Sequence, residues 1–349
     1  MNGTLSVIAP GIHTTVQDLG RVGYQALGVP VAGALDPVSL RLVNAVVGND
    51  PGTAALEFLY QGPEIEVNGE SVRIAAAGCG IEILGEPARH VPPWQSICLT
   101  RGARFRLGAT KGTVCGYLAI QGGLALASVL GSRSTYTRAR IGGFEGRALA
   151  ARDALPLAHP TAEPATELHL SLPPELAPPE RIRVVLGPQD THFTEAAVAT
   201  FLAEPFVVSK EADRMGLRLE GPRLAHARGH DIASDGIATG AIQVPGSGQP
   251  IVMLVDHQTT GGYPKIATVI SADLPAVGRL RPGESIRFRA VSTAEAEAAR
   301  RALEADIEQR ARSVRPAGED VRFNEAALYA GNLVSGIISA TDWPSDDSP

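Results

Sequence analysis

The chain has 349 residues, with 31 lysine and arginine residues against 37 aspartate and glutamate residues, for a formal net charge of −6 at pH 7. This length suits two or three domains, and the acidic balance argues against a chain that binds nucleic acid, which usually carries a basic excess. No apolar run reaches the roughly 20 residues of a membrane span, and no basic segment followed by an apolar stretch marks a secretory signal. We therefore expect a cytoplasmic chain with no nucleic-acid partner and no membrane partner.

Cysteine and histidine patterns point to no special chemistry. The three cysteines, Cys79, Cys98 and Cys115, form neither a disulfide framework nor a CxxC pair, so we expect free, mostly buried thiols. His13 and His257 each lack a second histidine or cysteine at ligand spacing, so no metal site is predicted.

Short runs rich in valine, isoleucine and leucine recur between glycine and proline turns in the first half of the chain. A helix is expected at residues 37–47, where Asp36 is the N-cap, Pro37 suits the first helical position and Gly48 suits the stop. The strands expected after this helix are residues 72–74, 97–99 and 117–120. Residues 96–107 are expected to form a hairpin around an Arg-Gly-Ala turn.

Residues 156–180 are rich in proline, alanine and glutamate and lack periodicity, which indicates a linker between two halves. Helices are expected beyond it at about residues 191–202 and 293–312. The second of these helices begins with Ser292 and Glu295, which fit a capping box. The strands expected in this half are residues 182–186, 251–255 and 286–288.

Strands therefore dominate, and they do not alternate regularly with helices, which argues against a doubly wound sheet. We predict a mainly β fold with a few helices. The predicted boundaries are an N-terminal β-barrel domain at residues 1–155, the linker at 156–180, a second β-barrel domain at 181–291, a C-terminal helix and extension at 292–340, and a disordered acidic tail at 341–349.

Several polar and glycine-rich strings stand out because the packing of a barrel does not require them. In chain order they are residues 11–24 with 28–36, 48–49 with 55–57, 122–123 with 131–135, 213–219, 240–245 and 256–265. Arg133 follows a glycine among small hydroxyl residues, so its loop either presents a guanidinium to a carboxylate or phosphate or fastens a barrel turn. Asp213 and Arg214 are adjacent, so one can face a cleft while the other anchors the chain.

Residues 256–265 gather the most chemistry. Asp256 ends an apolar run, and Gln258 is expected to point the same way two residues later. Thr259 to Gly262 are expected to form a turn whose amides could stabilise an oxyanion. Tyr263 and Lys265 share an orientation if the chain is extended there. This element predicts an active-site wall, and the alternative is a glycine-rich hairpin with an exposed lysine on the barrel rim.

These strings resemble the allophanate hydrolase subunit 2 family of biotin-dependent carboxyltransferases, and the match runs from about residue 11 to residue 288. The family includes the C subunit of prokaryotic 5-oxoprolinase, part of the carboxyltransferase region of urea carboxylase, and a bacterial protein that antagonises an inhibitor of a sporulation histidine kinase. The resemblance implies two cyclophilin-like β-barrel domains. Two positions depart from the family pattern, which has an arginine near Cys115 and a glutamine where Arg279 stands.

The site residues are assigned from these strings and this resemblance. The candidate catalytic residues are Asp213, Asp256 and Lys265. The candidate substrate-binding residues are Asn44, Arg133, Arg214, Gln243, Gln258, Thr260, Gly261, Gly262 and Tyr263. Asn44, on an otherwise apolar helix, is alternatively a satisfied buried polar group.

The resemblance implies a component of ATP-dependent 5-oxoprolinase that helps to convert 5-oxo-L-proline to L-glutamate. Its partners would be a B-type subunit, related to the kinase inhibitor, and an A-type subunit. ATP would act in the complex at an unassigned site, since the chain has no GxxxxGK[ST] string. The alternatives are a carboxyltransferase for urea or a similar amide, and a regulator that binds a kinase inhibitor without turnover. None of the chain's lysines adjoins a methionine, so biotin is not expected to be attached and would arrive on another protein.

Overall fold

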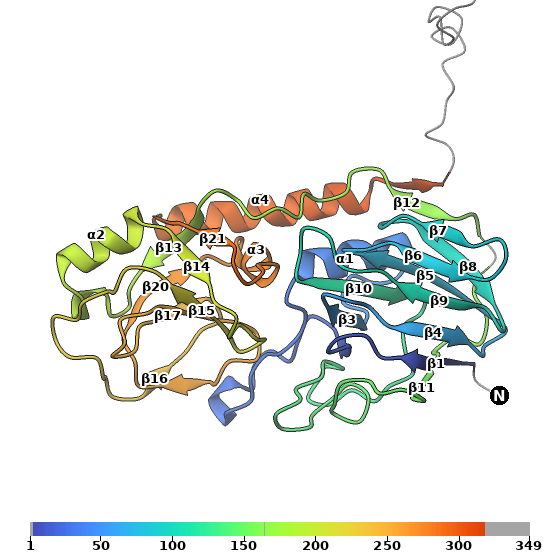
Figure 1. Cartoon of the computed structure of the whole chain (residues 1–349), viewed down its shortest axis with the longest axis horizontal. Helices are drawn as coiled ribbons and strands as arrows, with labels where there is room; N and C mark the ends of the chain where they lie inside the picture. Colours follow the sequence, from blue (N-terminus) through green and yellow to red (C-terminus); the bar gives the residue numbers. More distant parts are fainter. Residues whose placement is uncertain (1–2, 164, 318–349) are drawn as a thin grey trace, which may run out of the picture.

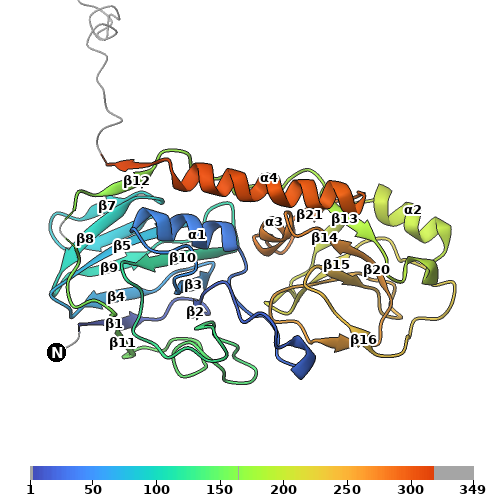
Figure 2. The same ribbon diagram turned by 180° about the vertical axis from the view of Figure 1, so that it is seen from behind.

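The computed structural model describes residues 3–163 and 165–317, which fold as two β-rich lobes placed side by side (Figure 1). Helix α4 (Thr293–Ala311) runs along one edge of both lobes, as the front and back views agree (Figure 2). In the described part of the chain, no helix is long and apolar enough to cross a membrane.

The first lobe consists of two packed sheets. The six-stranded sheet has the order β11 (Ala154–Pro156), β1 (Thr4–Ala9), β4 (Glu64–Val67), β9 (Arg104–Leu107), β6 (Ile81–Leu84) and β7 (Arg89–Val91). The five-stranded sheet has the order β2 (Thr15–Gln17), β3 (Ala55–Leu59), β10 (Cys115–Ile120), β5 (Ser71–Ala77) and β8 (Ser96–Thr100). Leu5, Ile65 and Phe105 from one sheet and Leu56 and Leu118 from the other are fully buried in one core. Burial of these aliphatic faces is what holds the two sheets together.

The hairpin predicted at residues 96–107 is wrong. Both strands exist, but β8 pairs with β5 in one sheet, whereas β9 pairs with β4 and β6 in the other. The turn between them carries the chain from sheet to sheet, and the Gly102 amide bonds to the carbonyl of Val67 on β4 instead of closing a two-stranded ribbon. The predicted turn is present, but a turn sequence does not specify which strands pair.

The second lobe is built on an eight-stranded sheet. Its order is β21 (Ser285–Ile286), β14 (Phe206–Val208), β15 (Gly216–Glu220), β18 (Ile251–Met253), β17 (Ala241–Gln243), β20 (Lys265–Val269), β13 (Ile182–Leu186) and β22 (Phe288–Ala290). A separate two-stranded ribbon joins β16 (Asp235–Gly236) to β19 (Thr260–Gly261). Helix α2 (Glu195–Ala203) packs on this lobe through Phe201, whose ring stacks on Phe288 with centroids 4.5 Å apart.

The helix predictions mostly hold. Helix α1 (Pro37–Val46) begins at Asp36, whose side chain accepts hydrogen bonds from the amides of Val38 and Ser39, and α4 has the predicted capping box. Helix α2 starts later than expected, because residues Asp190–His192 form a separate 3₁₀ turn and Thr194 is the N-cap. The short helix α3 (Leu274–Gly278) was not predicted.

The segment expected to be a linker is docked on the first lobe for part of its length. Within it, β12 (Leu168–Leu170) pairs with β23 (Val314–Pro316), which follows α4. Glu167 forms an ion pair with Arg73 at 2.7 Å and accepts a 2.7 Å hydrogen bond from the amide of Cys98. The domain boundaries stay a prediction, and the tail at 341–349 lies outside the described residues.

The mainly β fold with a few helices and two barrel-like lobes is confirmed. The three cysteines are free, as predicted, and Cys79 and Cys115 are buried. Burial raises the pKa of the Cys79 thiol to about 12, so this thiol stays protonated and unreactive.

Candidate functional site

A pocket of about 440 Å³, here called the Asp213 pocket, opens on the second lobe. It is lined by Arg138, Glu211, Asp213, Met215, Gly216, Arg218, Gln243, Ile251, Met253, Gln258 and Tyr263. Four of the sequence-predicted site residues therefore meet in one cavity: Asp213, Gln243, Gln258 and Tyr263. Their strings are up to about 50 residues apart in sequence, and the pairing of β15, β18 and β17 brings them together.

Asp213 is held in place by the tight turn that precedes β15. Its Oδ1 accepts hydrogen bonds from the amides of Met215 at 2.8 Å and Gly216 at 3.3 Å. Its Oδ2 faces Arg138 Nη2 at 3.5 Å, and the Asp213 side chain is 59% exposed. One oxygen is thus fixed by the backbone while the other faces the pocket mouth, where it can accept a proton or a ligand hydrogen bond.

Gln243, on β17, is only 2% exposed, and its Nε2 has no hydrogen-bond partner among the described residues. Buried amides are normally satisfied, so an unpaired one beside a cavity marks a place for a ligand or water. The chain passes close over this side chain at Gly261. A Cβ there would lie 2.8 Å from Gln243 Nε2 and 2.7 Å from Ile237 Cδ1. A larger residue at position 261 would require the ends of these two side chains to shift.

In sequence, Gln258 precedes β19 and Tyr263 follows it, and both side chains line the Asp213 pocket. Both are exposed, Tyr263 by 42%. The expected common orientation of Asp256 and Gln258 is wrong, because Asp256 is 5% exposed and points between the lobes. The reason is that β18 ends at Met253, so the alternation of a strand does not reach these residues.

The expected turn at residues 259–262 is also different in the structure. Thr260 and Gly261 form β19, which pairs with Gly236 and Asp235 of β16. Thr259 and Gly262 use their carbonyls to accept hydrogen bonds from the amides of Ile237 and Ile232. The segment is thus one strand of a small ribbon, not an open turn, and an oxyanion role for its amides stays a prediction.

Arg214 and Asp256 lie in a buried cluster between the two lobes. Arg214 donates from Nε and Nη2 to the carboxylate of Asp256 at 2.9 and 3.0 Å, and from Nη2 to the carbonyl of Gly33 at 2.7 Å. Its Nη1 bonds to Glu57 on β3 of the first lobe. Glu57 also accepts hydrogen bonds from the Tyr117 hydroxyl at 2.6 Å and the Leu35 amide at 2.8 Å. Asp213 thus faces a pocket while Arg214 anchors the chain, as their adjacency suggested.

Lys265 is 2% exposed, which corrects the alternative that placed it in solvent on a barrel rim. Its Nζ forms an ion pair with Asp235 at 2.8 Å and donates to the carbonyl of Gly236 at 3.2 Å. Tyr263 is 42% exposed, so the expected common orientation of Tyr263 and Lys265 is wrong as well. Lys265 does not line the Asp213 pocket. It holds the β16–β19 ribbon, which carries part of the pocket wall, against β20.

Asn44 and Arg133 lie in the first lobe, away from the Asp213 pocket. Asn44 is fully buried on α1, donates to the Thr53 carbonyl at 2.8 Å and accepts from Asn49 Nδ2 at 2.9 Å, so it is satisfied by the protein. Arg133 donates from Nε to the Leu126 carbonyl at 2.8 Å. Roles for these two residues in substrate binding stay predictions.

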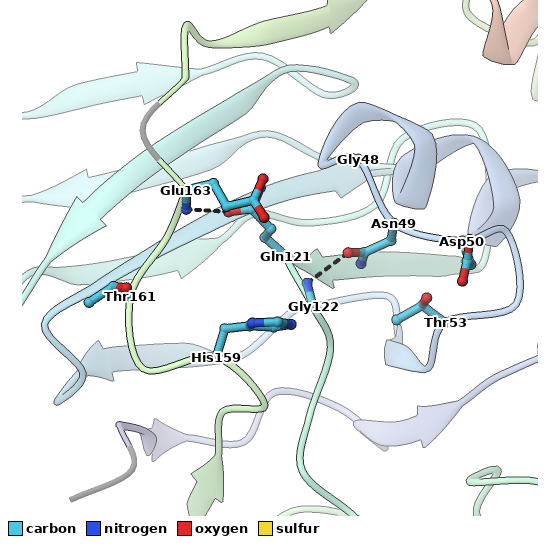
Figure 3. Close-up of a pocket in the computed structure, with 9 residues that line it drawn as sticks. All are labelled: Gly48, Asn49, Asp50, Thr53, Gln121, Gly122, His159, Thr161 and Glu163. Atoms are coloured by element: carbon cyan, nitrogen blue, oxygen red, sulfur yellow. Dashed lines mark hydrogen bonds between the residues drawn. The ribbon is translucent and has the colours of Figure 1, made fainter.

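The Gly48-Asn49 and Gly122-Gly123 strings meet at a second pocket of about 300 Å³ (Figure 3). The Gly122 amide donates to Asn49 Oδ1 at 2.7 Å, and the Glu163 amide donates to Gln121 Oε1 at 3.0 Å. Asn49 also donates to the Ile120 carbonyl at 2.8 Å. These bonds join the end of α1 to the end of β10, which gives both strings a structural purpose.

Two residues that line the Asp213 pocket were not singled out from the sequence. They are Arg138 and Arg218, and no local pattern distinguishes them from other surface arginines. Arg279, noted from the sequence only as a departure from the family pattern, pairs with Asp36 Oδ2 at 2.9 Å across the lobes. Among the described residues, no group of three histidine, cysteine or acidic side chains is placed to hold a metal ion.

Comparison with known proteins places this geometry in a family. Residues 27–290 match the carboxyltransferase domain family, subdomains A and B. The chain belongs to this family. It is 35% identical over 305 residues to the C subunit of 5-oxoprolinase from Escherichia coli, an alignment that covers 87% of this chain and 97% of that protein. It is 33% identical to the urea amidolyase of Saccharomyces cerevisiae over 81% of this chain but only 16% of the yeast protein.

The solved structure of the Kluyveromyces lactis urea amidolyase gives a TM-score of 0.78 at 30% identity. The match covers 88% of this chain and 20% of that chain. Members of the carboxyltransferase domain family thus form parts of two enzyme systems. In one of these systems the family member is a separate subunit.

Proposed function

We propose that this chain is the C subunit of a 5-oxoprolinase, which acts with B-type and A-type subunits to convert 5-oxo-L-proline to L-glutamate with ATP hydrolysis. The observation that carries the proposal is the near end-to-end correspondence with a stand-alone C subunit, at 97% of its length. The urea amidolyase relative corresponds to this chain in only 16% of its length.

The Asp213 pocket suits an amide substrate. A lactam presents a carbonyl that accepts hydrogen bonds and an N–H that donates one. The amide groups of Gln243 and Gln258 and the hydroxyl of Tyr263 can satisfy both kinds of group. Asp213, fixed by the turn amides, can accept a proton from the water that opens the ring. Phosphorylation of the lactam carbonyl by ATP would provide the activation, and we assign no residue of this chain to ATP.

Activity is expected to require the partner subunits. The purified chain should release no glutamate from 5-oxoproline and ATP, and co-expression with A-type and B-type subunits should restore release. The measurement is glutamate formation by each subunit alone and by every combination. Turnover by the isolated chain would contradict the proposal. Tight binding of a partner without turnover in any combination would favour the regulatory alternative.

The second candidate is carboxyl transfer from carboxybiotin to urea or a related amide, favoured by the TM-score of 0.78 to the Kluyveromyces lactis enzyme. Biotin would then arrive on another protein, since Lys111, Lys210 and Lys265 all lack an adjacent methionine. We expect the intact mass of the chain, co-expressed with a biotin ligase, to match the unmodified sequence. An added mass of one biotin would contradict this expectation. Biotin-dependent carboxylation of urea by the reconstituted complex would favour the second candidate over the first.

A further inference from the structure

Arg138 reaches the Asp213 pocket from the other lobe. Every other lining residue in the described part of the chain falls between residues 211 and 263, whereas Arg138 belongs to the first lobe. Its Nη2 lies 3.5 Å from Asp213 Oδ2. The cavity is therefore completed by the packing of the two lobes, and the first lobe contributes a single positive charge to its mouth.

The guanidinium of Arg138 is available to a ligand. Its side chain is 58% exposed, the Asp213 side chain is 59% exposed, and 3.5 Å is long for a charged hydrogen bond. Exposed ion pairs of this kind hold their partners weakly. Arg218, the other arginine of the pocket, also forms an exposed ion pair, with Glu211 at 3.3 Å. A ligand carboxylate can therefore gain two parallel hydrogen bonds from Arg138 at little cost to the protein.

A second lining residue, Gln243, has an unpaired amide nitrogen. Gln243 is 2% exposed, and its Nε2 lacks a protein partner among the described residues. Met215, Ile251 and Met253 supply apolar surface to the same cavity. The pocket lining thus combines an amide, apolar side chains and a guanidinium. A small ring with a carbonyl, methylene groups and a carboxylate has matching chemistry.

We propose that the Asp213 pocket selects cyclic amides that carry a carboxylate, and that Arg138 is the residue that recognises the carboxylate while Gln243 binds the ring carbonyl. This inference rests on the proposed function and deepens it, because neutral amides such as urea have no carboxylate to pair with Arg138. Arg138 determines which substrate binds, and other residues of the site open the ring.

The test uses the reconstituted complex with Arg138→Gln, Arg138→Lys and the control Arg140→Gln. Arg140 is exposed, lies two residues away and does not line the pocket. We expect Arg138→Gln to raise the KM for 5-oxoproline by about 10- to 100-fold, the range for a hydrogen bond to a charged group, with kcat changed far less. Arg138→Lys should recover part of this loss, and Arg140→Gln should match the wild type.

The matched ligand is 2-pyrrolidinone, the same lactam without the carboxylate. The wild-type complex should bind 5-oxoproline more tightly than 2-pyrrolidinone in calorimetry, and Arg138→Gln should remove that preference without weakening 2-pyrrolidinone. Equal binding of the two ligands by the wild type, or an unchanged preference in Arg138→Gln, overturns the inference even if 5-oxoproline is turned over. A complex that shows the preference but releases no glutamate supports the inference and contradicts the proposed function instead.

Gln243→Met tests the second proposed contact, because it keeps the side chain's length and removes the amide. It should lower the affinities for 5-oxoproline and 2-pyrrolidinone by similar factors, since both ligands have the ring carbonyl. Loss of affinity for 5-oxoproline alone would contradict the assignment of Gln243 to the carbonyl. Thermal melts of all the variants identify any that fail to fold, and the Arg138 variants, which change an exposed side chain, keep the inference testable in that case.

Discussion

Replacing Arg214 with alanine is expected to lower the free energy of unfolding by about 3–5 kcal/mol, because it leaves two buried carboxylates without their counter-ion. Arg214 and Asp256 are each 5% exposed and Glu57 is 1% exposed. Burial by itself lowers the pKa of Arg214, but the charges of Asp256 and Glu57 outweigh burial, so the net shift of the pKa is upward. The guanidinium is therefore charged at every pH at which the protein folds, and its removal takes away the counter-ion of both carboxylates.

The loss should appear as a lower denaturation midpoint in chemical unfolding monitored by circular dichroism. The control is Arg301→Ala, whose partner Glu297 is 3.8 Å away on the surface of α4 and whose own side chain is 71% exposed. That change should stay within about 0.5 kcal/mol of the wild type. Adding Glu57→Gln and Asp256→Asn to Arg214→Met should recover much of the stability, because no unpaired charge then remains. Equal midpoints for Arg214→Ala and Arg301→Ala would show that the interlobe cluster does not hold the lobes together.

The two positions that depart from the expected family pattern lie close together at the interlobe surface. Cys115 Sγ lies 3.9 Å from the carbonyl oxygen of Gly278, next to Arg279, so the two departing positions share one site. Arg279 pairs there with Asp36, which is fully buried at the start of α1. The buried carboxylate of Asp36 keeps a cation, as its burial requires.

Helix positions were well predicted because their signals are local. Asp36, Ser292 and Glu295 make the predicted side-chain bonds to nearby backbone amides, so a few adjacent residues determine where α1 and α4 begin. Strand pairing was predicted less well. β8 and β9 are only four residues apart but belong to different sheets, since each pairs with strands that lie far away in sequence.

Four of the predicted site residues come together in the structure, but the arrangement of the others could not be inferred. The strings singled out Asp213, Gln243, Gln258 and Tyr263, and all four line one pocket. Burial could not be inferred for Lys265, because its partner Asp235 lies 30 residues earlier and only the β16–β19 ribbon brings the two together. Arg138 was missed for a related reason: its importance arises from the contact between the lobes, which no local pattern encodes.

Lys265→Met is expected to lower the activity of the reconstituted complex by roughly 10-fold or more, equivalent to at least about 1.4 kcal/mol of barrier. Its Nζ is directed to Asp235 and Gly236 and not to the Asp213 pocket, so the loss would arise from loosening of the β16–β19 ribbon between Gln258 and Tyr263. The melting temperature should also fall, because Lys265 is 2% exposed and makes two hydrogen bonds. Replacement of an exposed lysine would leave the melting temperature unchanged, and we do not expect that result for Lys265.

Asp235→Asn separates this positioning role from direct catalysis, because it removes the anion that orients the amine and leaves Lys265 in place. A positioning role predicts that Asp235→Asn lowers kcat about as much as Lys265→Met, and that the double variant is no worse than either single change. If Lys265 itself stabilises charge on the reacting atoms, Lys265→Met should cost about 10²–10³ in kcat while Asp235→Asn stays near the wild type. Kinetics of the three variants in the complex, alongside their melts, decide between the two roles. The ion pair of the buried Lys265 amine with Asp235 and the absence of Lys265 from the pocket lining favour positioning.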